Sequence, residues 1–363
     1  MAGPVRQPID IPSLETYIIQ HVPHIQPPLQ IEQFRFGFSN PTYQLTDANG
    51  ARFVMRKKPP GASFNKSAHQ IEREFRILEA LKYTEVPVPT TYCLCEDTSV
   101  LGTAFYIMEF IEGRVGLANH LPNTAPDDRF EMWRSAIQIL AKLHKVDYES
   151  VGLATFGKQF GYYNRQLKTF SAVALQQATV LDVETKEPVG PIPHVDEMIS
   201  MLREDQPEDR TSIVHGDFKL DNLVFHPTEP RVIGVLDWEL ATIGHPLSDV
   251  STILNPFSAD SMMRTPEFAP GATPGLPTLE QCISWYRDFS GYNVERDLAW
   301  GRAFYAFKTS VNMQGIAARY ARRQVSNAGA GEYLKNRKKY AADAWETVQL
   351  SLRRYRNGGD SRL

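Results

Sequence analysis

The sequence is poor in cysteine, with only Cys93, Cys95 and Cys282 in 363 residues. Three cysteines do not support a disulfide framework. The short Cys93-Leu94-Cys95 segment also has no second cysteine pair with which to complete a zinc site. We therefore expect the three side chains to act as small apolar residues in a reducing compartment.

The chain also lacks a strong charge of one sign and a long apolar run. Its formal net charge of -3 at pH 7 gives no general attraction to nucleic acid or to an anionic membrane. No run approaches the roughly 18 uninterrupted apolar residues of a membrane helix, and the N-terminal MAGPVRQPIDIP has no apolar signal region. We expect a soluble intracellular protein with no nucleic-acid partner and no membrane span.

The most informative stretch lies between Ile213 and Asp249. Two short apolar runs flank the segment 226–230, whose two prolines break regular structure, and this pattern predicts a β-hairpin. Pairing across the midpoint of the turn places Asn222 beside Asp237. Their side-chain oxygens are ligands that suit the hard cation of a nucleotide complex. Asp217 lies five residues before Asn222 and would accept the proton of a substrate hydroxyl.

The motif His215-Gly216-Asp217 followed by Asn222 resembles the HGDxxxxN catalytic loop of the aminoglycoside phosphotransferase and choline kinase group. Asp237-Trp238-Glu239 looks like that group's counterpart of the DFG motif of protein kinases. The resemblance implies that Asp217 is the catalytic residue and that Asn222 and Asp237 hold Mg²⁺ on the phosphates of ATP. Lys219 and Glu239 are further candidates for this site.

The same resemblance implies an α+β, protein-kinase-like fold of two lobes, with an antiparallel-sheet N-lobe and a mainly helical C-lobe. We expect an N-terminal extension over residues 1–30, a nucleotide-binding N-lobe over 31–113 and a C-lobe over 114–356. The last residues, 357–363, are expected to form a flexible tail. Helical spacing of apolar residues predicts helices over 11–21, 71–81, 126–147 and 194–203, and again after Thr278.

The segment 34–45 resembles the strand, turn and return strand that close over the ATP phosphates in related kinases. Ser39 and Asn40 would offer hydrogen-bond donors to the phosphates there. An ordinary hairpin remains the alternative interpretation. The following segment, Asp47-Ala48-Asn49-Gly50, predicts a second hairpin turn.

The strand after this turn carries Arg56 where the related kinases place a phosphate-binding lysine. Arginine also binds phosphate, through its planar guanidinium. Lys57 is the alternative, although it points to the opposite face of the strand. Glu74, on the helix predicted over 71–81, would pair with the basic residue and orient it.

The strand-like segment 104–111 resembles the hinge between kinase lobes, where the backbone from Glu109 to Ile111 would bind adenine. Gly244-His245-Pro246-Leu247-Ser248-Asp249 matches the GxPLxD element of the family. The resemblance makes Asp249 an acceptor for backbone groups of the catalytic loop, so Asp249 and His215 are assigned to structural support. His144, at a helix end, is also read as structural.

The segments 56–60, 86–90 and 92–97, together with the long catalytic stretch, resemble one branch of the family. This branch is the kinase-like domain joined to an acyl-CoA dehydrogenase in the animal family members ten and eleven. This resemblance implies phosphorylation of a hydroxyl on a hydroxy fatty acid or its CoA thioester, within fatty acid metabolism. The alternatives are a choline, aminosugar or homoserine kinase and a pseudokinase in a partner complex. A basic set would suit an anionic acceptor, but a solvated helical face is the favoured interpretation. That set comprises Arg319, Arg322, Arg323, Lys335, Arg337, Lys338 and Lys339.

The terminal Ser361-Arg362-Leu363 resembles the peroxisomal address Ser-Lys-Leu, with arginine in place of lysine. The expected partner is then a peroxisomal import receptor, in addition to the small-molecule hydroxy acceptor. We expect a peroxisomal location if the source is eukaryotic and a cytoplasmic one otherwise.

Overall fold

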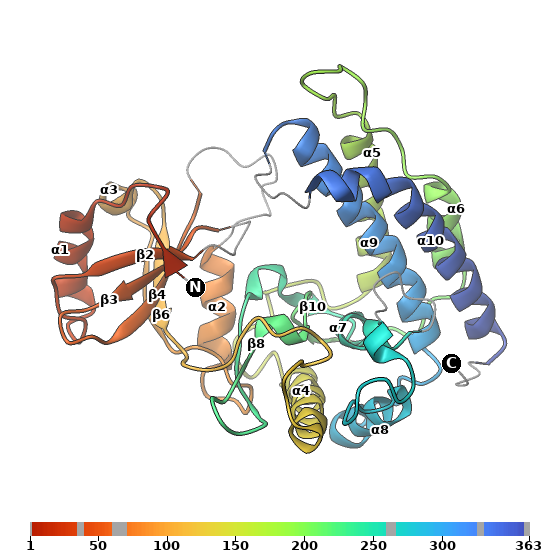
Figure 1. Ribbon diagram of the computed structural model, residues 1–363, viewed down its shortest axis with the longest axis horizontal. Coiled ribbons are helices and arrows are strands. Elements are labelled where there is room, and N and C mark those ends of the chain that lie inside the picture. Colours follow the sequence, from red (N-terminus) through yellow and green to blue (C-terminus); the bar gives the residue numbers. More distant parts are fainter. Residues whose placement is uncertain (1, 35–39, 60–70, 259–265, 325–329, 359–363) are drawn as a thin grey trace. The chain divides into compact units, whose positions relative to one another are not determined.

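The computed structural model describes residues 2–34, 40–59, 71–258, 266–324 and 330–358, with no side chains given for 330–337. The chain divides into two compact units (Figure 1). Unit 1 contains residues 1–117, 147–154 and 221–241, and unit 2 contains 118–146, 155–220 and 242–363. Ser39 and the terminal tripeptide 361–363 lie outside the described residues, so the roles expected for them stay predictions.

Unit 1 is built on an antiparallel sheet of six strands in the order β1-β2-β3-β4-β6-β5. The predicted hairpin turn joins β3 to β4, where the N–H of Asp47 donates to the carbonyl of Ala51 at 2.9 Å. The register of this hairpin pairs Thr42 with Arg56. The strands are β1 (Ala2–Gly3), β2 (Gln30–Phe34), β3 (Thr42–Thr46), β4 (Arg52–Lys57), β5 (Thr91–Cys95) and β6 (Phe105–Glu109).

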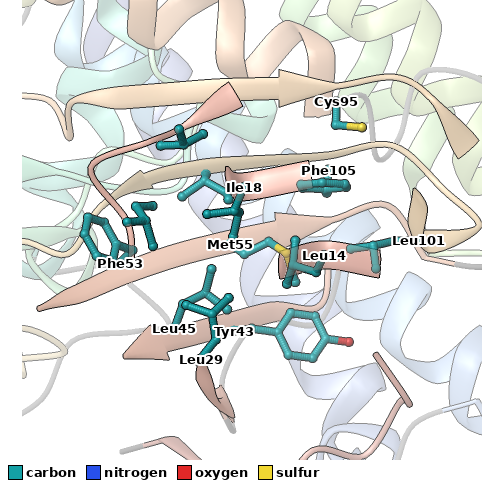
Figure 2. Packing of buried hydrophobic residues seen from close by; sticks show 13 residues of the cluster. Leu14, Ile18, Leu29, Tyr43, Leu45, Phe53, Met55, Cys95, Leu101 and Phe105 are labelled. Carbon is teal, nitrogen blue, oxygen red and sulfur yellow. The ribbon is translucent and has the colours of Figure 1, made fainter. Parts of the chain in front are cut away.

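Three helices accompany this sheet, and two of them have the bounds expected from the sequence. These helices are α1 (Ile11–His21), α2 (Ile71–Leu81) and α3 (Thr98–Leu101). Asp10 caps α1 by accepting the N–H of Ser13 at 3.1 Å. Leu14 and Ile18 of α1 pack into the apolar cluster of the sheet, beside Met55 (Figure 2). Residues 1–30, expected as an extension, thus supply β1 and α1 to unit 1 and form part of its core.

The predicted hairpin of the catalytic stretch is present as β8 (Leu223–Phe225) and β9 (Val232–Val235), with Leu223 opposite Val235. Sequence reasoning placed this hairpin in the second lobe, whereas its contacts group it with unit 1. Arg114 and Phe225 exchange backbone hydrogen bonds of 2.8 and 2.9 Å, and the N–H of Val235 donates to the carbonyl of Pro87 at 2.9 Å. These backbone bonds fasten the hairpin to the residues around the hinge strand.

Unit 2 is mainly helical. The helix predicted over 194–203 is observed one residue later as α6, and α9 and α10 run side by side (Figure 1). The short strands β7 (Ser212–Val214) and β10 (Thr242–Gly244) pair antiparallel and bring the catalytic motif next to the GxPLxD element. The helices are α4 (Pro126–Lys145), α5 (Tyr162–Ala178), α6 (Val195–Glu204), α7 (Leu247–Leu254), α8 (Leu279–Ser290), α9 (Leu298–Ala321) and α10 (Ala330–Arg356).

An antiparallel-sheet unit and a mainly helical unit are what the sequence predicted for a kinase-like α+β fold, and the expected fold class is confirmed. Short 3₁₀ turns occur at Leu220–Asn222 and Trp238–Leu240, on either side of the catalytic hairpin. Among the helices of the described chain, none combines the length and apolarity needed to cross a bilayer.

Candidate active site

The site residues predicted from the sequence divide between the two units. Unit 2 holds the catalytic loop up to Leu220, with Asp217 and its supports, and unit 1 holds Asn222, Asp237 and the basic residue of β4. The covalent chain joins the two sets at Leu220-Asp221. Only five positions separate Asp217 from Asn222 along the sequence.

Asp249, in the first turn of α7, organises the catalytic loop in unit 2. One of its carboxylate oxygens accepts the backbone N–H of His215 at 2.7 Å, and the other accepts that of Gly216 at 2.8 Å. His144 lies 3.4 Å from the same carboxylate through Nε2, and its Nδ1 lies 2.7 Å from the hydroxyl of Tyr286. The expected hydrogen bonds from the loop N–H groups to Asp249 are present, and His144 has a structural position.

The charge on Asp249 is stabilised although the residue is fully buried. Burial alone would raise its pKa, but the hydrogen bond from His144 and the interactions with His144 and His215 outweigh it and lower the pKa below the ordinary value. Backbone amides that point at a carboxylate favour its ionised form. The loop before Asp217 is therefore held by a permanent negative charge.

We call Asp249, with the backbone N–H groups of His215 and Gly216 that it accepts, the Asp249 cradle. Asp217 is the next residue of the loop, and its side chain is one third exposed. Its backbone N–H donates to Nδ1 of the buried His215 at 3.2 Å, which fixes the loop locally. The ammonium of Lys219 lies 3.2 Å from the Asp217 carboxylate. The proposed base is thus accessible and held by its neighbours in the loop.

Asn222 and Asp237 close the end of the β8–β9 hairpin in unit 1. The N–H of Leu236 donates to the backbone carbonyl of Asn222 at 2.9 Å, so Leu236 lies opposite Asn222. Asp237 is the next residue along the chain. Asp237 adopts a left-handed backbone with φ of 66°, which is uncommon for a residue other than glycine and turns the chain sharply. Its side chain is 39% exposed, so its carboxylate can receive a ligand.

The guanidinium of Arg56 on β4 pairs with three carboxylates in unit 1. Its guanidinium lies 2.5 Å from Glu74 on α2, 3.1 Å from Asp237 and 3.7 Å from Glu239. The expected pairing of Glu74 with the basic residue of the preceding strand is present, and Arg56 rather than Lys57 makes it. Glu239, a further candidate from the sequence, joins the same cluster.

The Arg56–Glu74 pair is buried, and burial works against both charges. Burial raises the pKa of Glu74 to about 7 despite the attraction of Arg56, with the Asp237 and Glu239 carboxylates adding to the rise. Burial also opposes the charge of Arg56, but the carboxylates around it raise its pKa above the ordinary value. Arg56 therefore stays protonated, and three carboxylates share its positive charge.

Lys57 and Asn40 lie apart from this cluster. Lys57 is buried as well, and burial lowers its pKa. Asn40 is 1% exposed, and its side-chain oxygen and nitrogen have no hydrogen-bond partner among the described residues. Buried polar groups are normally paired, and the role of a phosphate donor expected for Asn40 stays a prediction.

The hinge residues are fixed to the segment after Pro89. The backbone N–H of Glu109 donates to the carbonyl of Thr90 at 2.7 Å, and the N–H of Thr90 donates to the Glu109 carboxylate at 3.0 Å. These bonds anchor the end of β6. The backbone contact to adenine expected over Glu109 to Ile111 stays a prediction.

One residue near the catalytic loop was missed from the sequence. Lys308, in the middle of α9, donates to the carbonyl of Gly216 at 2.9 Å. No local pattern signals this contact, because the two residues are 92 positions apart. A lysine within a largely buried helix is the one sequence feature that could have drawn notice.

Comparison with known proteins agrees with this geometry. Residues 30–274 match the model of the phosphotransferase enzyme family. Among curated proteins, mouse acyl-CoA dehydrogenase family member 10 is 36% identical over 94% of the chain and 32% of its own length. Human family member 11 is 37% identical over 86% of the chain and 39% of its own length. The chain therefore spans about two fifths or less of these relatives.

Solved structures share the fold. A putative aminoglycoside phosphotransferase from Ralstonia eutropha is 37% identical, with a TM-score of 0.79, over 94% of this chain and 99% of that one. A thermostable mutant of aminoglycoside phosphotransferase APH(4)-Ia, in a complex with AMP-PNP and hygromycin B, is 15% identical with a TM-score of 0.54, over 94% of this chain and 98% of that one. The chain belongs to the phosphotransferase enzyme family, whose members transfer phosphoryl groups to hydroxyl groups.

Proposed function

We propose that this phosphotransferase moves the γ-phosphoryl group of ATP to a hydroxyl of a hydroxy fatty acid or a hydroxyacyl-CoA. The observation that carries the kinase part is the Asp249 cradle, which holds the backbone of His215 and Gly216 and so orients Asp217. The nucleotide part is supported by a structure of the same fold that contains AMP-PNP.

Each residue has a definite task in this reaction. Asp217 accepts the proton of the acceptor hydroxyl as its oxygen attacks the γ-phosphorus, and the bond from that phosphorus to the bridging oxygen of ADP breaks. Arg56, oriented by Glu74, steadies the α and β phosphates. Catalysis of this kind rests mainly on positioning and charge neutralisation rather than on covalent chemistry.

Asn222 and Asp237 would hold Mg²⁺, which when bound neutralises phosphate charge. An accessible carboxylate and a nearby amide fit this ion, because Mg²⁺ in kinase sites takes one or two carboxylates and completes its shell with phosphate oxygens and water.

The acceptor class is supported by the relatives. Their names describe acyl-CoA dehydrogenases, and this chain matches only a part of each of them. A kinase-like domain joined to an enzyme of acyl-CoA chemistry fits an acceptor of the same chemistry, with a hydroxyl on the acyl chain. Choline, aminosugars and homoserine are the competing acceptors.

An acceptor screen tests the proposal. The enzyme is incubated with ATP and Mg²⁺ and with hydroxy fatty acids, hydroxyacyl-CoAs, choline, homoserine and aminoglycosides, and products are read by mass spectrometry. A gain of one phosphoryl group on the hydroxy fatty acids or their thioesters supports the proposed acceptor. A gain only on choline, homoserine or the aminoglycosides overturns it, and no turnover on any acceptor favours a pseudokinase.

The variant Asp217→Asn tests the assigned base. Transfer should fall about 100- to 10,000-fold, the usual contribution of a general base, while ATP affinity and the unfolding transition stay as in the wild type. Asp196→Asn, an exposed residue of α6, is the matched control and should keep full activity. Full activity of Asp217→Asn on a validated acceptor would contradict the assignment.

A further inference from the structure

Helix α9 is buried on nearly all sides, and one strip of it is accessible. The residues between Gly301 and Ala321 that are not buried recur at steps of three and four. Such steps fall on one face of a helix. The strip consists of Tyr305, Lys308, Asn312, Met313, Ile316, Arg319 and Tyr320.

Lys308 is the point where this strip meets the catalytic loop of unit 2. Its ammonium donates to the carbonyl of Gly216 at 2.9 Å, one residue before Asp217. The carboxylates of Asp217 and Asp249 act on the Lys308 charge, and Lys219 opposes it. The ammonium of Lys308 therefore lies close enough to Asp217, the proposed base, for their charges to interact.

This ammonium has little compensation within the described chain. Its hydrogen-bond partner is a neutral carbonyl, and no described carboxylate lies within ion-pair distance of its Nζ. Burial lowers the pKa of Lys308, and the two carboxylates offset the effect in part. A desolvated ammonium whose carboxylate neighbours lie beyond ion-pair distance is costly, and a bound anion would lower that cost.

We propose that Lys308 binds an anionic group of the acceptor, so that the acceptor is a hydroxy acid carrying a free carboxylate rather than a cationic alcohol. The proposal rests on the function proposed above and narrows its acceptor class. Lys308 and Lys219 place two ammonium groups beside Asp217, and like charges would disfavour choline or an aminosugar there.

The γ-phosphoryl group of ATP is another anion that could meet Lys308. The charge of the acceptor distinguishes these two anions. If Lys308 binds the phosphoryl group, its loss should affect the transfer to every acceptor equally. If Lys308 binds the acceptor's carboxylate, its loss should affect only acceptors that are acids. Paired acceptors that differ in this one charge, a hydroxyoctanoate and its neutral methyl amide, therefore distinguish them.

The test compares the wild type with Lys308→Met, which keeps the apolar stem, and Lys308→Arg, which keeps the charge. For the acid, Lys308→Met should raise KM about 10- to 100-fold, as expected for losing a hydrogen bond to a charged group. KM for the amide should change less than threefold, and Lys308→Arg should retain the preference for the acid. Lys145→Met, an exposed lysine of α4, is the matched control and should leave both acceptors unchanged.

A binding experiment judges Lys308 without turnover. Octanoate, which lacks the hydroxyl, should bind the wild type and Lys308→Arg in calorimetry and bind Lys308→Met about 10- to 100-fold more weakly. Equal losses for acid and amide, or equal octanoate affinity in all variants, would overturn the proposal. If the acceptor screen finds no hydroxy fatty acid as substrate, the proposed function fails, while the octanoate result still decides the role of Lys308. Circular dichroism confirms that each variant is folded.

Discussion

Two buried carboxylates, one in each unit, are stabilised by different means. Glu74 in unit 1 is held by the guanidinium of Arg56, and Asp249 in unit 2 is held by two backbone amides and a histidine. Both are almost inaccessible to water, at 1% and 0% exposed. Their pKa values nevertheless move in opposite directions, upward for Glu74 and downward for Asp249.

The difference shows what each carboxylate is suited to do. The hydrogen bond and charge of His144, with His215 and the backbone amides of the loop, lower the pKa of Asp249 despite its burial and favour its ionised form. The guanidinium of Arg56 pairs with Glu74, Asp237 and Glu239. In the proposed reaction Asp237 would hold the Mg²⁺ of the nucleotide, so Arg56 also pairs with a residue of the nucleotide site. The contacts of Asp249 in unit 2 are therefore a fixed support for the catalytic loop, and the Arg56 cluster in unit 1 is the proposed site of phosphate binding.

The largest effect is expected for Asp249→Ala. The backbone N–H groups of His215 and Gly216 and the His144 ring would lose their acceptor while buried. Unsatisfied buried donors cost about 1–3 kcal/mol each, so unfolding free energy should fall by about 5 kcal/mol. Phosphoryl transfer should fall at least about 100-fold, because the loop that carries Asp217 loses its support. Urea unfolding and steady-state kinetics measure the two effects.

The matched control is Asp288→Asn on α8, an exposed acid beside Arg287. Surface ion pairs are worth about 0–1 kcal/mol, so this control should be nearly neutral. If Asp249→Ala unfolds like the control, the cradle does not support the loop, and the contrast between the two carboxylates fails.

Much of this arrangement could be predicted from the sequence. The helix that carries Glu74 has the bounds Ile71–Leu81 that its apolar period indicates, because its stripe packs on a sheet. The hairpin ending at Asp237 follows from two apolar runs around prolines. The contact of Asp249 with the catalytic loop could be expected only from resemblance, since 34 residues separate Asp249 from His215.

The remainder depends on contacts that leave no local pattern. β1 is two residues long and shows no alternation, so its pairing with β2 could not be foreseen. The hairpin groups with unit 1 through backbone bonds to Pro87 and Arg114, and any residue type could make those bonds. Lys308 reaches Gly216 only because α9 passes the catalytic loop.

The next prediction separates Arg56 from Lys57. Arg56→Met should raise KM for ATP about 10- to 100-fold, the result of losing a charge-assisted contact to phosphate. It should also lower unfolding free energy by about 3 kcal/mol, the low end for breaking a buried ion pair, because Glu74 can take up a proton. Kinetics at varied ATP and urea unfolding test both.

Lys57→Met is the matched control for this comparison, since Lys57 is equally buried on the same strand but has no part in the Glu74 cluster. It should leave KM for ATP within about threefold of the wild type, well below the effect of a charged hydrogen bond. A larger effect from Lys57→Met than from Arg56→Met would make Lys57 the phosphate contact and reverse the assignment.

The last effect concerns pH and develops gradually over the interval between two pKa values. A carboxyl whose pKa is raised on folding stabilises the folded state most below its ordinary pKa of 4.5 and loses that contribution as pH rises to about 7 for Glu74. At about 1.4 kcal/mol per pKa unit, a rise from 4.5 to about 7 corresponds to a loss of at most about 4 kcal/mol. Glu74→Gln cannot titrate, so its unfolding free energy should decline less than that of the wild type over this interval. Urea unfolding at a series of pH values gives the difference.

His245 supplies a comparison of opposite sign. It is fully buried, its Nδ1 accepts the N–H of Leu247 at 3.2 Å, and burial lowers its pKa from 6.5 to about 4. The unfolded state then binds the proton more tightly, so this contribution is present above pH 6.5 and is lost as pH falls toward 4. His245→Asn should therefore reduce the fall in unfolding free energy as pH decreases, whereas Glu74→Gln should reduce its fall as pH increases. Difference curves of the same sign for both variants would mean that Glu74 is ionised throughout, and that Arg56 holds it as firmly as the amides hold Asp249.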